Sequence, residues 1–188
     1  MRRLLLCSGG LDSSAVALLY SPEALLFVDY GQKARGREWK AVCHLSKLIH
    51  RPLIVRRVRP DYPCSHGYLP ARNLLLLSVA IPAAERFGFG EIWFGFTKGE
   101  VYGDATAEWI DKANELLQTE GLRVKVVAPA VTLSDSELII KACEQFGVRW
   151  LLKTYSCMSA PACGVCVKCH RRETFINHLI VELKEGLK

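Results

Sequence analysis

The stretch Leu4-Leu5-Leu6-Cys7-Ser8-Gly9-Gly10-Leu11-Asp12-Ser13-Ser14 predicts a buried strand, a tight glycine turn and the start of a helix. Such a turn gathers unpaired backbone amides and the positive end of a helix dipole at one place. Glycine lets an anion approach the backbone closely, and the serines add hydroxyl donors. We therefore predict a phosphate or pyrophosphate site. The alternative is an ordinary strand-to-helix turn with Asp12 or Ser13 as the helix N-cap.

Length and composition favour a soluble, one-domain protein with a substantial core, since the chain has 188 residues, 50% of them apolar and 23% charged. Neither a signal-peptide pattern nor a membrane-length apolar run is present, so we expect a cytoplasmic protein without a membrane segment. The net charge of +6 fits an anionic small molecule such as ATP. Because the basic residues are scattered, we do not expect nucleic acid as a partner.

Strands alternate with helices along most of the chain. The predicted strands span 3–7, 24–29, 53–58, 91–97 and 124–128. The predicted helices span 12–20, 36–50, 74–87, 105–119, 135–146 and 171–183. The alternation, with continuously apolar strands, predicts an α/β fold with a doubly wound, mostly parallel sheet of about five strands. We expect one compact unit, with an α/β domain at 1–150 and a small helical segment at 151–188 packed on it.

Polar residues stand where ligands bind in open α/β sheets, beyond the carboxyl ends of the strands. Asp29, Tyr30 and Gln32 close the second predicted strand. Arg72 and Asn73 precede an apolar helix, where a charged residue is poor core material. We predict that both lie beside an anion or a nucleobase, with capping or surface positions as the alternative. The segment 61–68 is loop-like and suited to covering a site.

Four of the eight cysteines lie within thirteen residues, at Cys157, Cys163, Cys166 and Cys169. Four closely spaced thiolates favour one tetrahedral Zn²⁺, with an iron–sulfur cluster as the alternative. Four unrelated core cysteines would need more apolar neighbours than this segment offers. Because four thiolates leave no open position on zinc, we expect a structural ion that braces the segment and holds residues 153–156 against the site.

Four motifs run from one end of the chain to the other: S-G-G-L-D-S at 8–13, F-V-D-Y-G-Q at 27–32, L-P-A-R-N at 69–73, and T-Y-S-C through C-G-V-C-V-K-C at 154–169. Together they resemble the 7-cyano-7-deazaguanine synthase family of N-type ATP pyrophosphatases. Many pyrophosphatases share the first motif, whereas its combination with the four cysteines is much more specific. The resemblance implies an adenine nucleotide α-hydrolase-like sheet, an ATP-dependent C–N ligase of queuosine and archaeosine precursor synthesis, and a homodimer.

The resemblance also implies a reaction in which ATP with Mg²⁺ adenylates the carboxylate of 7-carboxy-7-deazaguanine. Ammonia then gives the amide, and a second ATP drives dehydration to the nitrile. The turn would hold pyrophosphate through Ser8, Gly9, Gly10, Leu11, Asp12 and Ser13. The nucleotide or the substrate carboxylate would lie near Asp29, Tyr30, Gln32, Arg72 and Asn73. The candidate catalytic residues are Asp12, Lys98 and Lys153.

The segment 97–108 departs from the family's usual deazapurine-contacting pattern, to which only Tyr102 and Asp104 can be matched. Three alternatives therefore stay open. The first is a relative that couples the activated acid to another amine or to a protein. The second is a tRNA-modifying enzyme, such as a thiolase, with the same pyrophosphatase loop. The third is a zinc-stabilised interaction module with a vestigial nucleotide loop.

Overall fold

A computed structural model describes residues 1–60, 69–98 and 103–185, with side chains up to residue 177. The predicted covering loop at 61–68 and the matched residue Tyr102 lie outside the described residues. In the described part of the chain, no helix is both long and apolar enough to cross a membrane.

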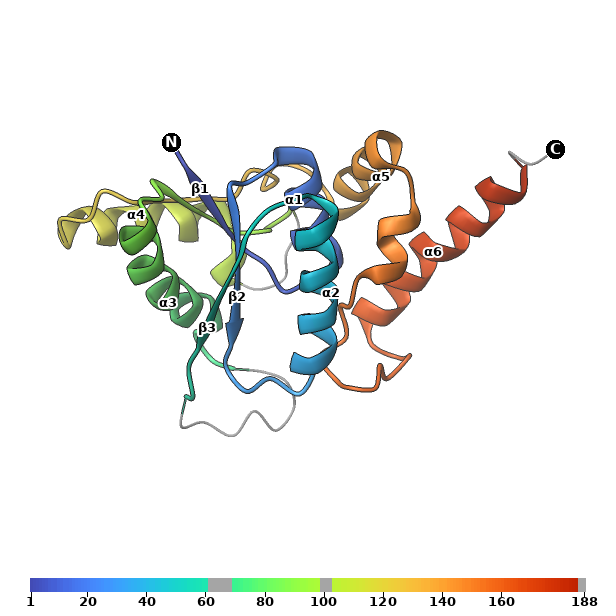
Figure 1. The fold of residues 1–188 in the computed structure, drawn as a ribbon, viewed down its shortest axis with the longest axis horizontal. Helices are drawn as coiled ribbons and strands as arrows, with labels where there is room; N and C mark the ends of the chain where they lie inside the picture. Colours follow the sequence, from blue (N-terminus) through green and yellow to red (C-terminus); the bar gives the residue numbers. More distant parts are fainter. Residues whose placement is uncertain (61–68, 99–102, 186–188) are drawn as a thin grey trace.

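Five parallel strands form the central sheet in the order β3-β2-β1-β4-β5 (Figure 1). They are β1 Arg3–Leu6, β2 Ala24–Asp29, β3 Leu53–Arg57, β4 Glu91–Trp93 and β5 Lys125–Val127. The chain proceeds from β1 outward to β3, then crosses back to add β4 and β5 on the other side of β1. The sheet is doubly wound, as predicted, and its direction of growth reverses between β1 and β4, where such sheets bind ligands.

Helices cover both faces of the sheet (Figure 1). One face carries α3 Arg72–Phe87 and α4 Ala107–Thr119, and the 3₁₀ turn η1 Gly103–Ala105 precedes α4. The other carries α1 Leu11–Tyr20, α2 Arg35–Leu48, α5 Asp135–Phe146 and the 3₁₀ helix η2 Arg149–Lys153. The last helix, α6 Val167–Glu185, runs outward from this body (Figure 1).

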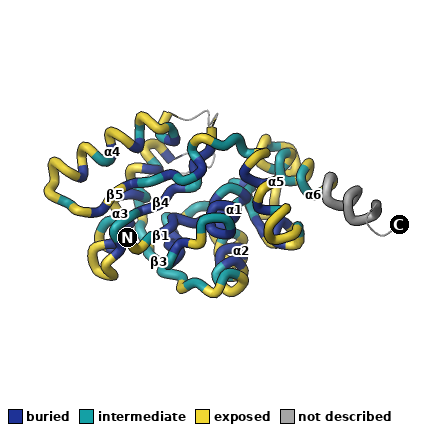
Figure 2. The backbone as a smooth tube through the Cα atoms, turned by 90° about the horizontal axis from the view of Figure 1, so that it is seen from above, coloured by how far each residue is buried: buried dark blue, intermediate teal, exposed yellow. Residues whose placement is uncertain are grey.

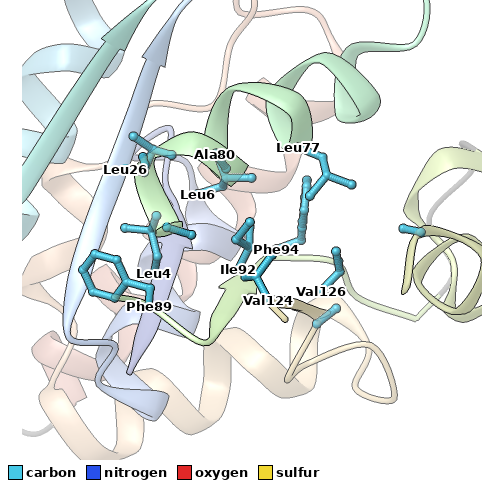
Figure 3. Packing of buried hydrophobic residues seen from close by; sticks show 14 of the residues in the cluster. Leu4, Leu6, Leu26, Leu77, Ala80, Phe89, Ile92, Phe94, Val124 and Val126 are labelled. Carbon is cyan, nitrogen blue, oxygen red and sulfur yellow. The ribbon is translucent and has the colours of Figure 1, made fainter. Parts of the chain in front are cut away.

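The core consists of two layers because successive side chains of a strand point to opposite faces. Leu4 and Leu6 pack under α3, where Figure 3 shows Leu6 beside Ala80 and Leu4 beside Phe89, whereas Leu5 joins the layer under α1. Every residue of β2 is buried, as expected for a parallel strand covered on both faces. In Figure 2 the buried stretches follow the strands and the inward sides of the helices.

Two predicted boundaries were wrong near the site. The strand predicted at 91–97 ends at Trp93, because after Phe94 the chain leaves the sheet at Gly95 to pass the first turn of α1. A Cβ on Gly95 would lie 3.1 Å from the Ser13 backbone. The helix predicted at 171–183 begins at Val167, because the chain already turns helically at Cys166, whose carbonyl accepts the His170 amide at 3.0 Å.

Candidate active site at the glycine turn

The glycine turn after β1 is pressed against α2. Gly9 has φ +74°, and a Cβ there would lie 2.6 Å from Ala41 Cβ, so the close approach requires glycine. Helix α1 starts at Leu11 with Gly10 as N-cap and no capping side chain. The interpretation of Asp12 or Ser13 as the N-cap was therefore wrong. The first amides of α1 lack intrahelical acceptors and are the type of donor that binds phosphate.

A cavity of about 570 Å³ opens at this turn, between the carboxyl ends of β1, β2 and β4. It has the size of a small-molecule site. The predicted site residues that line it are Ser8, Gly10, Asp12, Ser13, Tyr30, Gln32, Arg72 and Asn73. Three others, Gly9, Leu11 and Asp29, are not among the lining residues. The structure thus brings together predicted residues from three separate parts of the sequence.

Asp29 is buried next to the cavity, and its contacts stabilise the end of β2. Its carboxylate accepts the Gly31 amide at 3.1 Å and pairs with Arg35 at 3.4 Å and Arg59 at 3.1 Å. Burial alone would raise the pKa of Asp29, but the Gly31 amide and the Arg59 guanidinium outweigh burial and lower it. These contacts make Asp29 a support of the cavity wall.

Gln32 shapes the wall after β2 and positions an acid that sequence reasoning missed. The Gln32 Oε1 accepts the Tyr30 amide at 3.0 Å, and its Nε2 donates to the Glu38 carboxylate at 2.8 Å. Burial raises the pKa of Glu38, although the bond from Gln32 opposes this shift. Glu38 lines the cavity, yet its position within an amphipathic helical pattern gives no signal for a site.

Arg72 and Asn73 begin α3 at the opposite wall. Asn73 is buried, and its Nδ2 donates to the Asp104 carbonyl at 2.9 Å, so it ties α3 to the segment before α4. Within the described part of the chain, the buried Nε of Arg72 has no hydrogen-bond acceptor. A buried guanidinium nitrogen without an acceptor beside a cavity fits an anionic ligand.

The structure does not bring Lys98 and Lys153 to the cavity. Both side chains are exposed and neither lines it. The Lys98 amide donates to the Leu133 carbonyl at 2.7 Å, so Lys98 joins the chain after β4 to the segment before α5. The cations that sequence reasoning missed are Lys33, Lys168 and Arg171, which do line the cavity.

Arg171 links Asp12 to the far wall of the cavity. Its guanidinium donates to the carboxylates of both Asp12 and Asp135, and the Thr97 hydroxyl donates to Asp135 as well. Burial raises the pKa of Asp12, although the Arg171 guanidinium opposes this shift. One arginine of α6 thus balances two carboxylates at the N-termini of α1 and α5.

The segment before the cysteines packs directly on the glycine turn. The Tyr155 amide donates to the Gly9 carbonyl at 2.9 Å, and the Leu11 amide donates to Ser156 Oγ at 3.2 Å. These two bonds join residues about 145 positions apart in sequence. The prediction that residues 153–156 are held against the site is confirmed for Tyr155 and Ser156, which line the cavity. Lys153 is exposed and Thr154 is buried, and neither lines the cavity.

The four cysteines predicted as metal ligands converge, with all four sulfur atoms within 4.8 Å of one another. Cys157 Sγ lies 3.7 Å from Cys163 Sγ, which lies 3.9 Å from Cys169 Sγ. For Zn–S bonds of about 2.3 Å, tetrahedral geometry places sulfurs about 3.8 Å apart. The cluster therefore fits a single tetrahedral ion.

The thiols of the cluster differ in their pKa values. Backbone amides of Val165 and Cys166 lower the pKa of Cys163 to about 6, whereas burial and the neighbouring thiols raise the pKa of Cys169 to about 12. One sulfur thus readily becomes a thiolate, and its neighbour then keeps its proton. A bound cation would let all four ionise together.

The fold and the site define a class of doubly wound α/β proteins with a phosphate-type glycine turn at the switch point of the sheet. A solved structure of this fold is the U34-tRNA thiolase from Methanococcus maripaludis with its 4Fe–4S cluster, with a TM-score of 0.56 and 13% identity. The match covers 93% of this chain and 63% of that one. At this identity the likeness shows the fold alone.

Sequence comparison places the chain within this class. A family model described as "Queuosine biosynthesis protein QueC" matches residues 46–179. A 7-cyano-7-deazaguanine synthase from Nitrosospira multiformis is 30% identical, over 92% of this chain and 89% of its own length. One from Methanothermobacter thermautotrophicus is 30% identical over 92% of each chain. The chain belongs to the QueC family and is an enzyme of that family, which confirms the resemblance seen in its four motifs.

Proposed function

We propose that this protein uses ATP to convert 7-carboxy-7-deazaguanine into 7-cyano-7-deazaguanine, the queuosine and archaeosine precursor. Its curated relatives carry the name of that synthase. One observation supports the proposal above the others. The turn residues Ser8 to Ser13, apart from Gly9 and Leu11, line a single cavity together with the two cations of α6, and the segment before the cysteines packs on the turn. These are the functional groups that carboxylate adenylation requires.

The proposed reaction has three steps. A carboxylate oxygen attacks the α-phosphorus of ATP, and the bond to pyrophosphate breaks to leave an acyl-adenylate. Ammonia attacks the acyl carbon, the bond to AMP breaks, and a proton is lost to give the amide. The amide oxygen attacks a second ATP with release of pyrophosphate, and loss of AMP and protons leaves the nitrile.

The protein's own groups supply binding and charge in this scheme. We propose that the amides and hydroxyls of the turn from Ser8 to Ser13 hold the phosphates, with Arg72 at the opposite wall. When bound with ATP, Mg²⁺ would neutralise phosphate charge, and Asp12 is the carboxylate best placed to position it. Because Lys98 and Lys153 lie outside the cavity, we assign the electrostatic role expected of them to Lys168 instead.

We propose that the cysteines hold one structural Zn²⁺. The sulfur spacing of 3.7 and 3.9 Å supports a single ion, since an iron–sulfur cube would separate its thiolate ligands further. Elemental analysis of the purified protein should give one zinc per chain and little iron. Iron with acid-labile sulfide at four atoms per chain would refute zinc.

We further propose that residues 151–188 form one unit with residues 1–150 and are not an independent domain. We also propose that the protein acts as a cytoplasmic homodimer. The bonds from Tyr155 and Ser156 to the glycine turn support the single unit. The family resemblance supports the dimer. Light scattering after gel filtration should give twice the chain mass of 21.0 kDa, and a monomer at micromolar concentration would refute it.

The proposed function is tested by incubating the protein with ATP, Mg²⁺, ammonia and 7-carboxy-7-deazaguanine, followed by mass spectrometry. We expect the nitrile together with two AMP and two pyrophosphate molecules for each product. The amide without the nitrile would refute the second activation alone. AMP formation that does not depend on the deazapurine acid would refute the substrate assignment.

A further inference from the structure

Arg171 of α6 bridges the glycine turn to another helix of the described chain. Its guanidinium donates to Asp12 on α1 and to Asp135 on α5. Asp135 is supported independently, because it accepts the Thr97 hydroxyl and because a capping box formed by Ser134 fixes the start of its helix. Arg171 thus holds Asp12 and Asp135 together through hydrogen bonds to both carboxylates.

We propose that Arg171 is a binding residue for the pyrophosphate released on adenylation, and that its guanidinium exchanges Asp12 for a pyrophosphate oxygen when the nucleotide binds. This inference rests on the proposed function, and it names a residue and an exchange of partners that the proposed function does not require. Asp135 would keep its bond to Arg171 throughout and act as the pivot of the exchange.

The charges that line the cavity support this exchange. Four lining residues are acidic (Asp12, Glu38, Asp104 and Asp135) and four are basic (Lys33, Arg72, Lys168 and Arg171), so the described lining carries no net charge. A triphosphate adds several negative charges to this balanced set. Because the Arg171 charge is already paired with Asp12 and Asp135, it becomes available to the added phosphate when it exchanges one of these carboxylates for a phosphate oxygen.

The geometry supports Arg171 for this role. Asp12 is the second residue of α1, so a group bonded to its carboxylate lies beside the first-turn amides that would hold phosphate. A guanidinium presents two parallel N–H groups that match two oxygens of a phosphate, as it now matches carboxylates. The exchange therefore needs a change of partner on one nitrogen and no rearrangement of α6.

Arg172 offers a matched control on the same turn of α6. Its guanidinium donates to Thr154 Oγ1 at 3.3 Å and to the Leu151 carbonyl at 3.4 Å, and it does not line the cavity. Loss of either arginine would disturb α6 to a similar extent near Cys169. Only the loss of Arg171 would remove a phosphate ligand.

The test is calorimetric binding of inorganic pyrophosphate with Mg²⁺, and separately of AMP, to the full-length, metal-loaded protein. Arg171→Met should bind pyrophosphate at least about tenfold more weakly, the loss expected for one charge-assisted contact, and AMP within twofold of wild type. Arg172→Met should bind both ligands within twofold of wild type. Metal content and thermal unfolding of each variant serve as checks of the fold.

Equal pyrophosphate affinity in Arg171→Met and wild type would overturn the inference, as would an equal loss of AMP and pyrophosphate affinity. If Arg171→Met does not fold, Arg171→Lys decides the matter. A single ammonium should still weaken pyrophosphate binding at least threefold while leaving AMP binding unchanged. Wild-type affinity of Arg171→Lys for pyrophosphate would overturn the inference. A wild-type protein that binds neither pyrophosphate nor AMP would instead refute the proposed function.

Discussion

Replacing Gly9 with alanine should destabilise the fold itself, not only the binding of a nucleotide. Gly9 has φ +74°, and an added Cβ would lie 2.6 Å from Ala41 Cβ and 2.8 Å from the Val42 nitrogen. Both contacts belong to α2, and Val42 is fully buried there. Neither atom is the end of a flexible side chain, so the clash can be relieved only by moving α2 or the turn.

The cost follows from two terms. A left-handed backbone costs a non-glycine residue about 1–2 kcal/mol. Overpacking of a closed interior site costs about 1–3 kcal/mol more. The sum of about 2–5 kcal/mol is a large share of the total free energy of unfolding, which is roughly 5–15 kcal/mol for a native domain.

Urea unfolding followed by circular dichroism measures this loss, with Gly36→Ala as the control. Gly36 lies in the first turn of α2 without a positive φ, and no described heavy atom lies within 4 Å of the added Cβ. The control should leave stability unchanged or raise it by up to about 1 kcal/mol. A free energy of unfolding of Gly9→Ala within roughly 0.5 kcal/mol of the wild-type value would contradict the packing of the turn on α2.

Three further predictions concern the site and the sheet. Asp12→Asn should lower turnover by at least about a hundredfold while leaving the urea midpoint and metal content close to wild type, and retained turnover would show that the phosphate site lies elsewhere. Cys163→Ser should bind metal substoichiometrically and lose turnover, because the cluster holds the segment that docks on the turn; full metal occupancy by elemental analysis would argue against Cys163 as a ligand. Glu23→Gln should lower the free energy of unfolding by about 1–2 kcal/mol at pH 7, because the Arg3 guanidinium lowers the pKa of Glu23 to about 2. A carboxyl with a lowered pKa loses its contribution as it is protonated, so the difference between variant and wild type should shrink from pH 4.5 toward 2, and a constant difference would refute the ion pair's role.

The order and type of the main elements could be predicted because each carries its own local pattern. The continuous apolar run of Ala24–Asp29 marks a doubly covered strand, and the Ser134 and Glu137 capping box marks the start of α5. The end of β4 could not be predicted, because Phe94 to Phe96 are as apolar as a strand. Only the neighbouring first turn of α1 makes the chain leave the sheet at Gly95.

The site residues could be predicted where they belong to the backbone turn that forms the site. Ser8 to Ser13 form such a turn, and Arg72 stands out as a charge in front of an apolar helix. Lys98 follows a predicted strand and Lys153 directly precedes the T-Y-S-C motif, but the direction of a side chain depends on packing between distant elements.

The sequence alone does not single out Arg171, because it belongs to an Arg-Arg pair among scattered basic residues. The signal that could have identified Arg171 is its spacing along α6, which begins at Val167. Residues 168 and 171 are three apart and so share one face of that helix, and both line the cavity. The earlier helix start, set by the cysteine turn, is what brings this face to the site.

The central claim is that the cavity at the glycine turn activates a carboxylate by adenylation. The most direct test is turnover of 7-carboxy-7-deazaguanine labelled with ¹⁸O in both carboxylate oxygens, with the mass of the released AMP as the readout. Adenylation predicts that each of the two AMP molecules carries one ¹⁸O and that the nitrile carries none. Unlabelled AMP, or release of ADP and phosphate in place of AMP and pyrophosphate, would contradict the account.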